Sequence, residues 1–546
     1  MFMMNIDHIH DMVDVDSDSE GEVVDDIAAL IDHLQNHKPK TTVNSLRQSV
    51  INFIAKNINY WADCMPSDCG RYLYILSPFD CLRTADVLAI TNQLVDFRLF
   101  QSQHIHLLFI SGLKKIDFSM MINHSINDNV LRTLFNRCKE IKDLAISPKT
   151  KISLPLLNEV PIQYPSLEHL NVNRDVCPFE FISRIASHCK MLKSLHLHFC
   201  INIKNSILEE MKSCIHLQRL TLAHAEQLTC QTLQLILSSL NKLNYLSLVG
   251  CKVNFGTLNR KIEHPSIRVL NLSWTELSDQ GLVSIVTCMK NIADLDVSNC
   301  KRLTTESFKY IGRLQSLLKL KCAYLSNSYV FDTNVEFCLI KIGLHLIELD
   351  LSGMPNVHTS TVAQCCPNLH ELFLNHCLHP VIEWTPASII FTSAGKTNYH
   401  WLSSYKEYFS MLEICHSLQK LSMSCMHVSS SNMPMLFSSE NSLRKMRFLP
   451  WSLESTDPIT ERFFLDFITN FRFDFLEELN LSHSDAVSFK VVLAALKLYP
   501  KLKELSVVNC DLVEQEILLL KEIKKKSGIN VVIQVSGANK NVVRVL

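Results

Sequence analysis

Glycine is scarce in this sequence, with only 12 among 546 residues, which leaves little material for the glycine-rich loops that hold phosphate groups. The formal net charge is −1, so no overall electrostatic attraction to nucleic acid is expected. No apolar run reaches the ~18 residues that a membrane span needs, and the first residues lack a signal-peptide pattern. The sequence therefore predicts a protein of the cytoplasm, the nucleus or both, with neither nucleic acid nor membrane as a partner.

Motifs of catalysis and metal binding are missing as well. The sequence holds no nucleophile elbow, Walker motif, H-E-x-x-H or kinase signature. Its 20 cysteines include no C-x-x-C pair, which zinc fingers require. We therefore expect a non-enzymatic protein with no metal, no cofactor and reduced cysteines of structural function.

A short leucine pattern recurs along most of the chain. Its form is L-x-x-L-x-L-x-x-C, and a full copy runs from Leu192 to Cys200. Further full copies begin at Leu243, Ile292, Leu369 and Leu502, and looser ones at Leu113, Ile141, Leu167, Leu217, Ile267, Leu317, Leu346, Leu418, Leu443 and Leu476. Successive starts between Leu113 and Leu369 lie roughly 23–29 residues apart, which is the leucine-rich-repeat period.

The physical properties of this repeat predict the architecture. The alternating x-L-x-L segment is typical of a short strand with one buried face, and the residues that follow have helical spacing. One strand and one helix cannot bury their apolar faces alone, so each repeat must stack on the next. We predict an α/β leucine-rich-repeat solenoid of about fifteen repeats, with a curved parallel sheet inside and helices outside.

A cysteine or a large apolar residue often stands three positions before the first leucine, as at Cys138, Cys189, Cys214 and Cys366. This position ends the helix and is expected to point into the stack. The pattern resembles the cysteine-containing subclass of leucine-rich repeats, which is found widely in substrate-recognition subunits of ubiquitin ligases.

The repeat pattern divides the chain into segments. We predict an acidic disordered tail (1–40), a helical adapter-binding or capping module (41–112), leucine-rich repeats (113–377), an aromatic-rich insertion (378–414), further repeats (415–536) and a polar C-terminal tail (537–546). Val531–Val535 is expected to be the last edge strand. Insertions in solenoids are loops over one face, often the binding face.

The helical module carries two short patterns. Leu46, Val50, Phe53, Ile54 and Ile58 are spaced to lie on one helix face. Such a helix can simply cap the exposed end of a solenoid.

A resemblance gives this module a function. Ser45-Leu46-x-x-x-Val50-x-x-x-Ile54 resembles the box that binds elongin C, with Val50 in place of the usual cysteine. Met65-Pro66-x-x-Cys69-x-x-x-Leu73 is similar to the cullin-2 box. The layout resembles ZYG-11 and antagonist-of-mitotic-exit-network proteins, although the armadillo region of ZYG-11 proteins is missing. The resemblance implies elongin B/C and cullin-2 as partners and the role of substrate receptor of a cullin-RING ubiquitin ligase.

Two alternatives stay open. Met65-Pro66 followed by Leu73, Ile75 and Leu76 also resembles a degenerate F-box, which would bind Skp1 and cullin-1. The protein can instead be a scaffold or regulator outside any ligase. The accessibility of Leu46 separates the substrate receptor from the scaffold, because docking to elongin C requires Leu46 to be accessible whereas a cap would bury it.

Residues beside the strand leucines are expected on the inner face of the solenoid. They carry both signs of charge, which favours a protein or peptide partner over nucleic acid. The candidate partner-binding residues are Asp296, Lys321, Glu348, Asp350, Phe373, Arg444 and Arg447.

Overall fold

The structure is a computed structural model. It describes residues 46–63, 78–97, 99–101, 104–118, 126–146, 150–173, 179–198, 205–260, 263–325, 331–355, 357–377, 416–427, 437, 441–451, 459–527, 531–536 and 542–545. The chain forms two compact units, which we call the N-terminal unit (Thr42–Leu303) and the C-terminal unit (Thr304–Leu546). We describe each unit by itself.

Parallel strands form the sheet of the N-terminal unit. Each strand begins two residues after the first apolar residue of a repeat, and its central leucine or isoleucine pairs with the equivalent residue of the next strand. The strands are β1 (Lys115–Asp117), β2 (Asp143–Ile146), β3 (His169–Asn173), β4 (Ser194–His198), β5 (Arg219–Leu222), β6 (Tyr245–Ser247), β7 (Val269–Asn271) and β8 (Asp294–Asp296).

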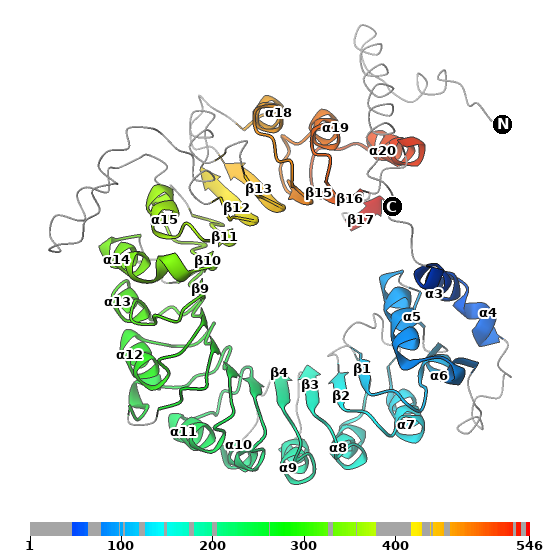
Figure 1. Cartoon of the computed structure of the whole chain (residues 1–546), viewed down its shortest axis with the longest axis vertical. Helices are drawn as coiled ribbons and strands as arrows, with labels where there is room; N and C mark the ends of the chain where they lie inside the picture. Colours follow the sequence, from blue (N-terminus) through cyan, green and yellow to red (C-terminus); the bar gives the residue numbers. More distant parts are fainter. Residues whose placement is uncertain are drawn as a thin grey trace, which may run out of the picture. The chain divides into compact units, whose positions relative to one another are not determined.

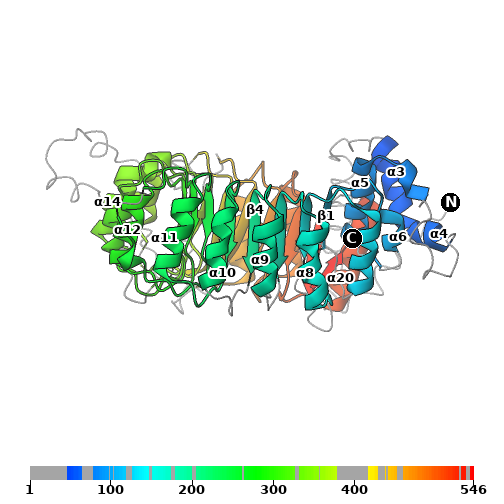
Figure 2. The ribbon, with the colours of Figure 1, turned by 90° about the horizontal axis from the view of Figure 1, so that it is seen from below.

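Helices cover the outer side of these strands and stand side by side (Figure 2). They are α7 (Asp128–Arg137), α8 (Leu154–Gln163), α9 (Phe179–His188), α10 (Asn205–Glu210), η3 (Met211–Ser213), α11 (Cys230–Ser239), η4 (Phe255–Thr257) and α12 (Asp279–Cys288). Side-chain caps fix several of the helix starts, because Asn127, Thr229 and Ser278 accept backbone N–H groups of the first turn.

The C-terminal unit repeats this design. Its parallel strands are β9 (Lys319–Lys321), β10 (Glu348–Asp350), β11 (Glu371–Phe373), β12 (Lys420–His427), β13 (Lys445–Trp451), β14 (Glu478–Asn480), β15 (Glu504–Val507) and β16 (Val532–Ser536). Phe373 of β11 pairs with Ser422 of β12, so the strands on either side of the predicted insertion are direct neighbours. The insertion itself (378–414) and the acidic tail (1–40) lie outside the described residues.

The C-terminal end of the chain differs from the prediction. We expected a polar tail at 537–546, but β17 (Val542–Val545) pairs antiparallel with β16. Val531–Val535 is therefore not a terminal edge strand. Valines at alternate positions are compatible with a strand, and the shortness of the segment hides this signal in the sequence.

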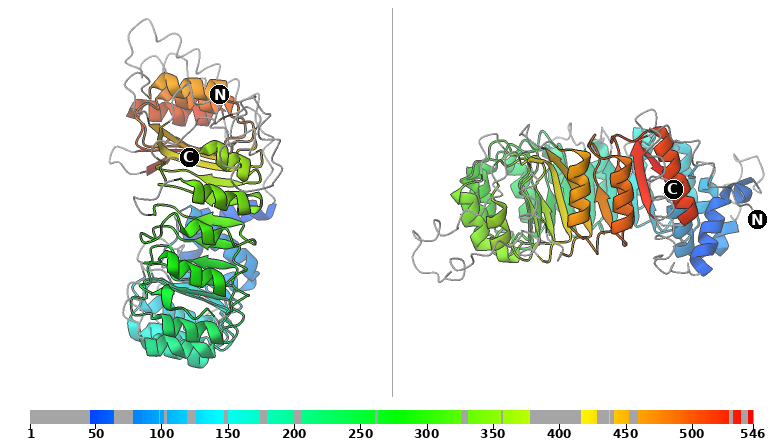
Figure 3. Two further views of the ribbon diagram at one scale, coloured as in Figure 1. Left: turned by 90° about the vertical axis from the view of Figure 1, so that its left-hand side faces the viewer. Right: turned by 90° about the horizontal axis from the view of Figure 1, so that it is seen from above.

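Helices of the C-terminal unit also lie outside its strands; α18, α19 and α20 stand in a row (Figure 3). The helices are α13 (Ser307–Ile311), α14 (Thr333–Ile342), η5 (Gly343–His345), α15 (Thr359–Cys365), α18 (Glu461–Asn470), α19 (Phe489–Leu498) and α20 (Glu514–Ser527). Phe463, Phe464 and Phe467 of α18 are buried and stack with Phe437 and Phe448. These five phenylalanines therefore belong to the core.

The repeat cysteines link neighbouring repeats. The Cys251 thiol donates to the Leu222 carbonyl oxygen at 2.9 Å, and Cys300 and Cys377 make the same bond to Leu272 and Leu351 at 3.1 and 3.3 Å. Burial raises the pKa of Cys251 and of Cys377 to about 12, which keeps both thiols protonated and able to donate. These cysteines thus tie each repeat to the one before it.

A helical module precedes the first repeat. It comprises α3 (Leu46–Lys56), α4 (Ile58–Asp63), η1 (Pro78–Cys81), α5 (Thr84–Asp96) and α6 (Ile105–Leu108). The helices α5 and α6 lie between α3 and the first repeat helix α7 (Figure 1). No helix among the described residues has the length and apolarity to cross a membrane.

Candidate functional site

The helix α3 has two apolar faces instead of the one that the sequence predicts. Ile51 and Ala55 are buried, and α3 packs against α5. Leu46, Val50 and Phe53 remain 82%, 47% and 65% exposed. The exposed residues, which we call the α3 outer face, thus form an apolar surface on a helix whose opposite side is already occupied.

Of the other predicted docking residues, Ile54 is half-buried and Ile58 is buried in α4, past a break in the helix at Asn57. Ile58 therefore leaves the predicted face. Met65, Pro66, Cys69 and Leu73 lie outside the described residues.

Polar contacts fix α3 on α5. Arg47 forms an ion pair with Asp86 at 2.7 Å, and Gln48 donates to Gln93 at 3.2 Å. Hydrogen bonds from Arg83 and Arg47 hold the pKa of Asp86 below its usual value. The orientation of the α3 outer face is thus set by the module itself.

The module also caps the first repeat, through a different element. Arg137 of α7 forms a largely buried ion pair with Asp80 of η1 at 3.0 Å, and the Cys138 thiol donates to the Ile110 carbonyl oxygen at 3.3 Å. Capping is therefore carried by the segment from η1 to Ile110, while α3 keeps its outer face free of the repeats.

A second candidate surface is the inner face of the C-terminal unit, formed by the residues on either side of each strand leucine. Charged residues beside the leucines pair across strands: Lys319 and Lys321, before and after Leu320, both contact Glu348 at 2.7 Å, Lys420 contacts Glu371 at 3.0 Å, and Lys445 contacts Glu478 at 2.5 Å. Most of the charge on this face is thus neutralised within the protein.

Glu348 is the most enclosed member of this row, with its side chain only 6% exposed. Burial raises the pKa of this carboxyl, but the hydrogen bonds and charges of Lys319 and Lys321 outweigh burial, so its pKa is lowered. Glu348, predicted as a partner-binding residue, therefore has an internal role in this arrangement, and Lys321 is its ion-pair partner.

Residues after the leucines hold the turns that follow the strands. Asp350 accepts the Ser352 N–H at 2.9 Å, and Asn480 accepts the Ser482 N–H at 3.0 Å. In the N-terminal unit Asp296 accepts the Ser298 N–H at 3.0 Å. The predicted binding residues Asp296 and Asp350 thus each commit one carboxylate oxygen to their own loop, as Asx turns do. The recurring Asp/Asn-apolar-Ser pattern is the sequence signal that reveals this role.

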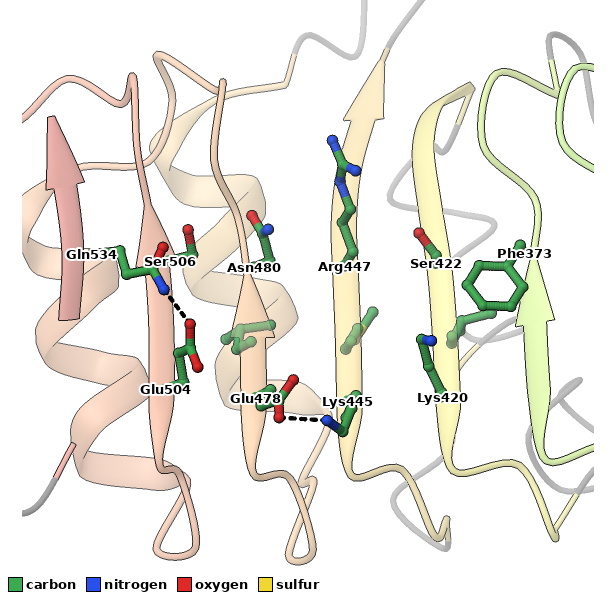
Figure 4. A pocket seen from close by; sticks show the side chains of 13 residues that line it. Phe373, Lys420, Ser422, Lys445, Arg447, Glu478, Asn480, Glu504, Ser506 and Gln534 are labelled. Carbon is green, nitrogen blue, oxygen red and sulfur yellow. Dashed lines mark hydrogen bonds and ion pairs between the residues drawn. The ribbon is translucent and has the colours of Figure 1, made fainter. Parts of the chain in front are cut away.

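Residues of strands β11 to β16 line a shallow hollow of about 240 Å³ on the inner face (Figure 4). Phe373 lies at one side with the Lys420 ammonium 4.7 Å above its ring. Arg447 extends from β13 between Ser422 and Asn480, its partners in the strand register. Arg444 lies outside the hollow and pairs with Glu477 at 3.0 Å. The structure thus brings Phe373 and Arg447 to one site, and it adds Asn480, Ser506 and Gln534, which the sequence analysis did not single out.

The inner face of the N-terminal unit carries neutral polar groups beside charged ones such as the Lys115–Asp143 ion pair. His196 lies between Ser194 and Thr221, with ring nitrogens 2.8 and 2.7 Å from the two hydroxyl oxygens. Burial and, to a smaller extent, the nearby Arg219 charge lower the pKa of His196 to about 4. The ring is therefore neutral near pH 7. No cluster of histidine, cysteine or acidic side chains suited to a metal ion occurs within the described part of the chain.

These strands, helices and turns define both units as leucine-rich-repeat solenoids of the α/β class, as predicted. No family model matches the chain. A curated relative, the BTB/POZ domain-containing protein FBL11 of Arabidopsis thaliana, is 22% identical over 323 residues. This match covers 55% of the chain and 29% of the relative, so the chain corresponds to less than a third of that protein.

Solved structures with a similar chain path share little sequence with it. A leucine-rich-repeat protein of Leptospira interrogans is 16% identical and covers 81% of this chain and 91% of its own, with a TM-score of 0.35. A chain from the Rad7 and Elc1 complex of yeast is 17% identical, covers 87% and 96%, and has a TM-score of 0.39. A chain from the mouse RP105/MD-1 complex is 15% identical, covers 78% and 80%, and has a TM-score of 0.43. Likenesses at this level say nothing about binding partners.

Proposed function

We propose that this protein is a non-catalytic substrate receptor of a cullin-RING ubiquitin ligase. In this role the α3 outer face binds an adapter of the elongin C type, and the inner face of the repeats binds a protein substrate. The observation that carries the proposal is the exposure of Leu46, Val50 and Phe53 on a helix whose other face packs on α5. A helix that served only as a cap would bury Leu46.

The exposure of Leu46 indicates how much this side chain can contribute to the free energy of adapter binding. Its side chain is 82% exposed, so almost the whole side chain is available for burial in a partner pocket. Burial of a leucine contributes about 1.5–3 kcal/mol, and truncation of interface anchors often costs about 2 kcal/mol or more. A Leu46→Ala substitution should therefore weaken adapter binding about ten-fold or more.

The choice of cullin rests on the second pattern. The resemblance of Met65-Pro66-x-x-Cys69-x-x-x-Leu73 to a cullin-2 box favours elongin B/C with cullin-2. The F-box hypothesis uses part of the same segment and leads to Skp1 and cullin-1. Since an F-box leaves the Leu46 helix without a function, the α3 outer face favours elongin C.

Titration calorimetry of the full-length protein against elongin B/C, and separately against Skp1, tests the proposal. Leu235→Ala is the matched control, because Leu235 is 43% exposed on a repeat helix of the same unit. We expect elongin B/C to bind the wild type and the control equally and Leu46→Ala at least ten-fold more weakly. Binding to Skp1 alone would assign the F-box class, and binding to neither would leave the scaffold function.

The cullin contact is tested on the preformed adapter complex. Pro66→Ala combined with Leu73→Ala should retain elongin B/C and lose cullin-2, since these residues lie in the second pattern. Size-exclusion chromatography with multi-angle light scattering distinguishes the two assemblies. Loss of elongin B/C from this variant would instead place both patterns in one contact.

A further inference from the structure

Arg447 differs from the four lysines that the structure describes on the inner face of the C-terminal unit. The lysines at 319, 321, 420 and 445 each contact a glutamate. Arg447 is exposed and makes no ion pair or hydrogen bond with its side chain among the described residues. Its guanidinium therefore offers all its N–H donors, in a planar fork that suits a carboxylate.

Asn480 supplies a further donor at the same place. Asn480 is the direct register neighbour of Arg447 on β14, and neighbouring strands lie about 4.8 Å apart. Its Oδ1 already accepts the Ser482 N–H at 3.0 Å. This bond fixes the amide orientation, so the Nδ2 hydrogens are the groups left for a ligand. The two side chains extend along the same face (Figure 4).

The surroundings limit the charge that this site can accept. Glu478 and Glu504 also line the hollow. Glu478 is paired with Lys445 at 2.5 Å, and Glu504 accepts a hydrogen bond from Gln534. Arg447 can compensate the single charge of a carboxylate, whereas a phosphate dianion has a second charge that stays uncompensated and is repelled by these two carboxylates. The site therefore favours a carboxylate.

Phe373 indicates that the ligand extends further. Its ring lies at the same hollow, two strands from Arg447 along the register from β11 to β13. An extended protein segment can place an acidic side chain at Arg447 and an apolar side chain at Phe373. Free carboxylic acids would use only the first of these contacts.

We propose that Arg447 and Asn480 form a recognition site for an aspartate or glutamate side chain of an extended protein segment, with Phe373 contacting an apolar residue of the same segment. The proposal deepens the substrate-receptor function, on which it rests for the role of the segment as substrate. It requires no contact with an adapter, so the two can fail separately.

A random twelve-residue peptide library displayed on phage, selected on the full-length protein, is the test. We expect the wild type to enrich peptides with an acidic residue at a constant distance from an apolar residue. The synthetic form of the most enriched peptide should bind Arg447→Gln at least about ten-fold more weakly, since a charge-assisted bidentate contact is lost. Arg444→Gln is the matched control, because Arg444 belongs to the same strand region but pairs with Glu477 outside the hollow.

Asn480→Asp is a sharper variant that should still fold. Asp350 makes the same turn contact at the equivalent position of its repeat, so an aspartate at 480 can accept the Ser482 N–H. The substitution replaces the outward donor by a negative oxygen beside Arg447. We expect it to abolish enrichment of acidic peptides while adapter binding through α3 stays unchanged.

Several outcomes would overturn the proposal. Equal binding of the selected peptide to wild type and Arg447→Gln would do so, as would absence of any acidic enrichment. Tighter binding of a phosphoserine version of the peptide would replace carboxylate by phosphate recognition. Acidic peptides could also be enriched only after residues 1–40 are deleted. This result would mean that the acidic run of the same chain at 14–22 is the ligand of the site. Unchanged elongin B/C binding throughout keeps each of these results separate from the proposed adapter function.

Discussion

The inner faces of the two units share one backbone and one leucine row but differ in chemistry. In the N-terminal unit His196 bonds to two hydroxyls, and the Arg219 guanidinium lies 4.8 Å from the Tyr245 ring centre. In the C-terminal unit glutamates and lysines pair across strands, as Glu348 does with Lys319. The leucines thus determine the fold, while the flanking positions vary without disturbing it and can carry recognition.

Because their side chains differ, the inner faces of the two units should also respond differently to acid. The N-terminal face includes the neutral His196, whose pKa is lowered, and the C-terminal face includes the ionised Glu348, which holds two lysines. Protonation affects the first in mildly acidic solution and the second only at lower pH, so the comparison can be tested one unit at a time.

The largest expected effect on stability concerns the buried leucine row, which the two units share. Leu220 on β5 and Leu349 on β10 are both fully buried. Truncation of either to alanine should lower the free energy of unfolding by about 2–5 kcal/mol, because each leaves a cavity. Since repeats contact mainly their neighbours, hydrogen exchange should rise in the altered strand and the strands beside it. Loss of structure in only one of the two variants would contradict the equivalence of the leucine rows.

The next largest effect is the pH dependence of stability that His196 causes. Its folded pKa is about 4, against an ordinary value of 6.5. Between these pH values the unfolded chain binds more protons, so the stability of the folded state decreases as the pH falls from 6.5 towards 4, by up to about 3 kcal/mol. Urea unfolding at several pH values should show this slope in the wild type and a smaller one in His196→Gln. Identical slopes would mean that the pKa of His196 in the folded state is close to its ordinary value.

Glu348→Gln should have a smaller effect, of about 1–2 kcal/mol, because two charge-assisted hydrogen bonds become weaker. The folded pKa of Glu348 lies below the ordinary 4.5. Its contribution is therefore complete above pH 4.5 and is lost as the pH falls through the folded pKa. The wild type and the variant should converge in stability in this acidic range, as circular dichroism melts can show. Glu371→Gln, at a pair with greater exposure, is the control and should change stability less.

The smallest effect concerns the turns after the strands, where both units place residues at positive φ. Trp274 has φ 62° and is 64% exposed, although bulky residues disfavour this conformation. Trp274→Asn should raise the free energy of unfolding by up to about 1 kcal/mol, because asparagine tolerates the left-handed region. The equivalent position in the C-terminal unit, His483 with φ 70°, is the matched comparison. A clear loss of stability in Trp274→Asn would show that the indole makes a contact that outweighs the strain.

The sequence predicts the strands well and the side-chain roles less well. Strands such as β4 and β10 follow from the leucine period, since every repeat must bury the same row. The two faces of α3 could not be predicted, because burial of Ile51 and Ala55 depends on α5, a helix more than 25 residues further along the chain. The helical spacing of Leu46 and Val50 is equally compatible with a buried face.

At the candidate binding surface, the charge of a residue does not give its contacts within the protein. Glu348 and Asp350 appear in the sequence as acidic contact residues, but one contacts two lysines and the other holds a turn. The leucine row gives the cross-strand register, but not which neighbours a charged side chain contacts, since Lys321 is aligned with Asp350 and pairs with Glu348. The register neighbours of Arg447, Ser422 and Asn480, are uncharged.

The reversed strand β17 has a consequence for self-association. A parallel repeat array that ended at β16 would present unpaired backbone groups on which a repeat of another molecule could continue the sheet. Because β17 runs antiparallel along β16, it occupies that edge and breaks the parallel order that a further repeat would extend. The strand is only four residues long, and short edge strands are poor templates for aggregation. β17 thus replaces the parallel edge of β16 by a short antiparallel edge, which is a poorer template for a repeat of another molecule.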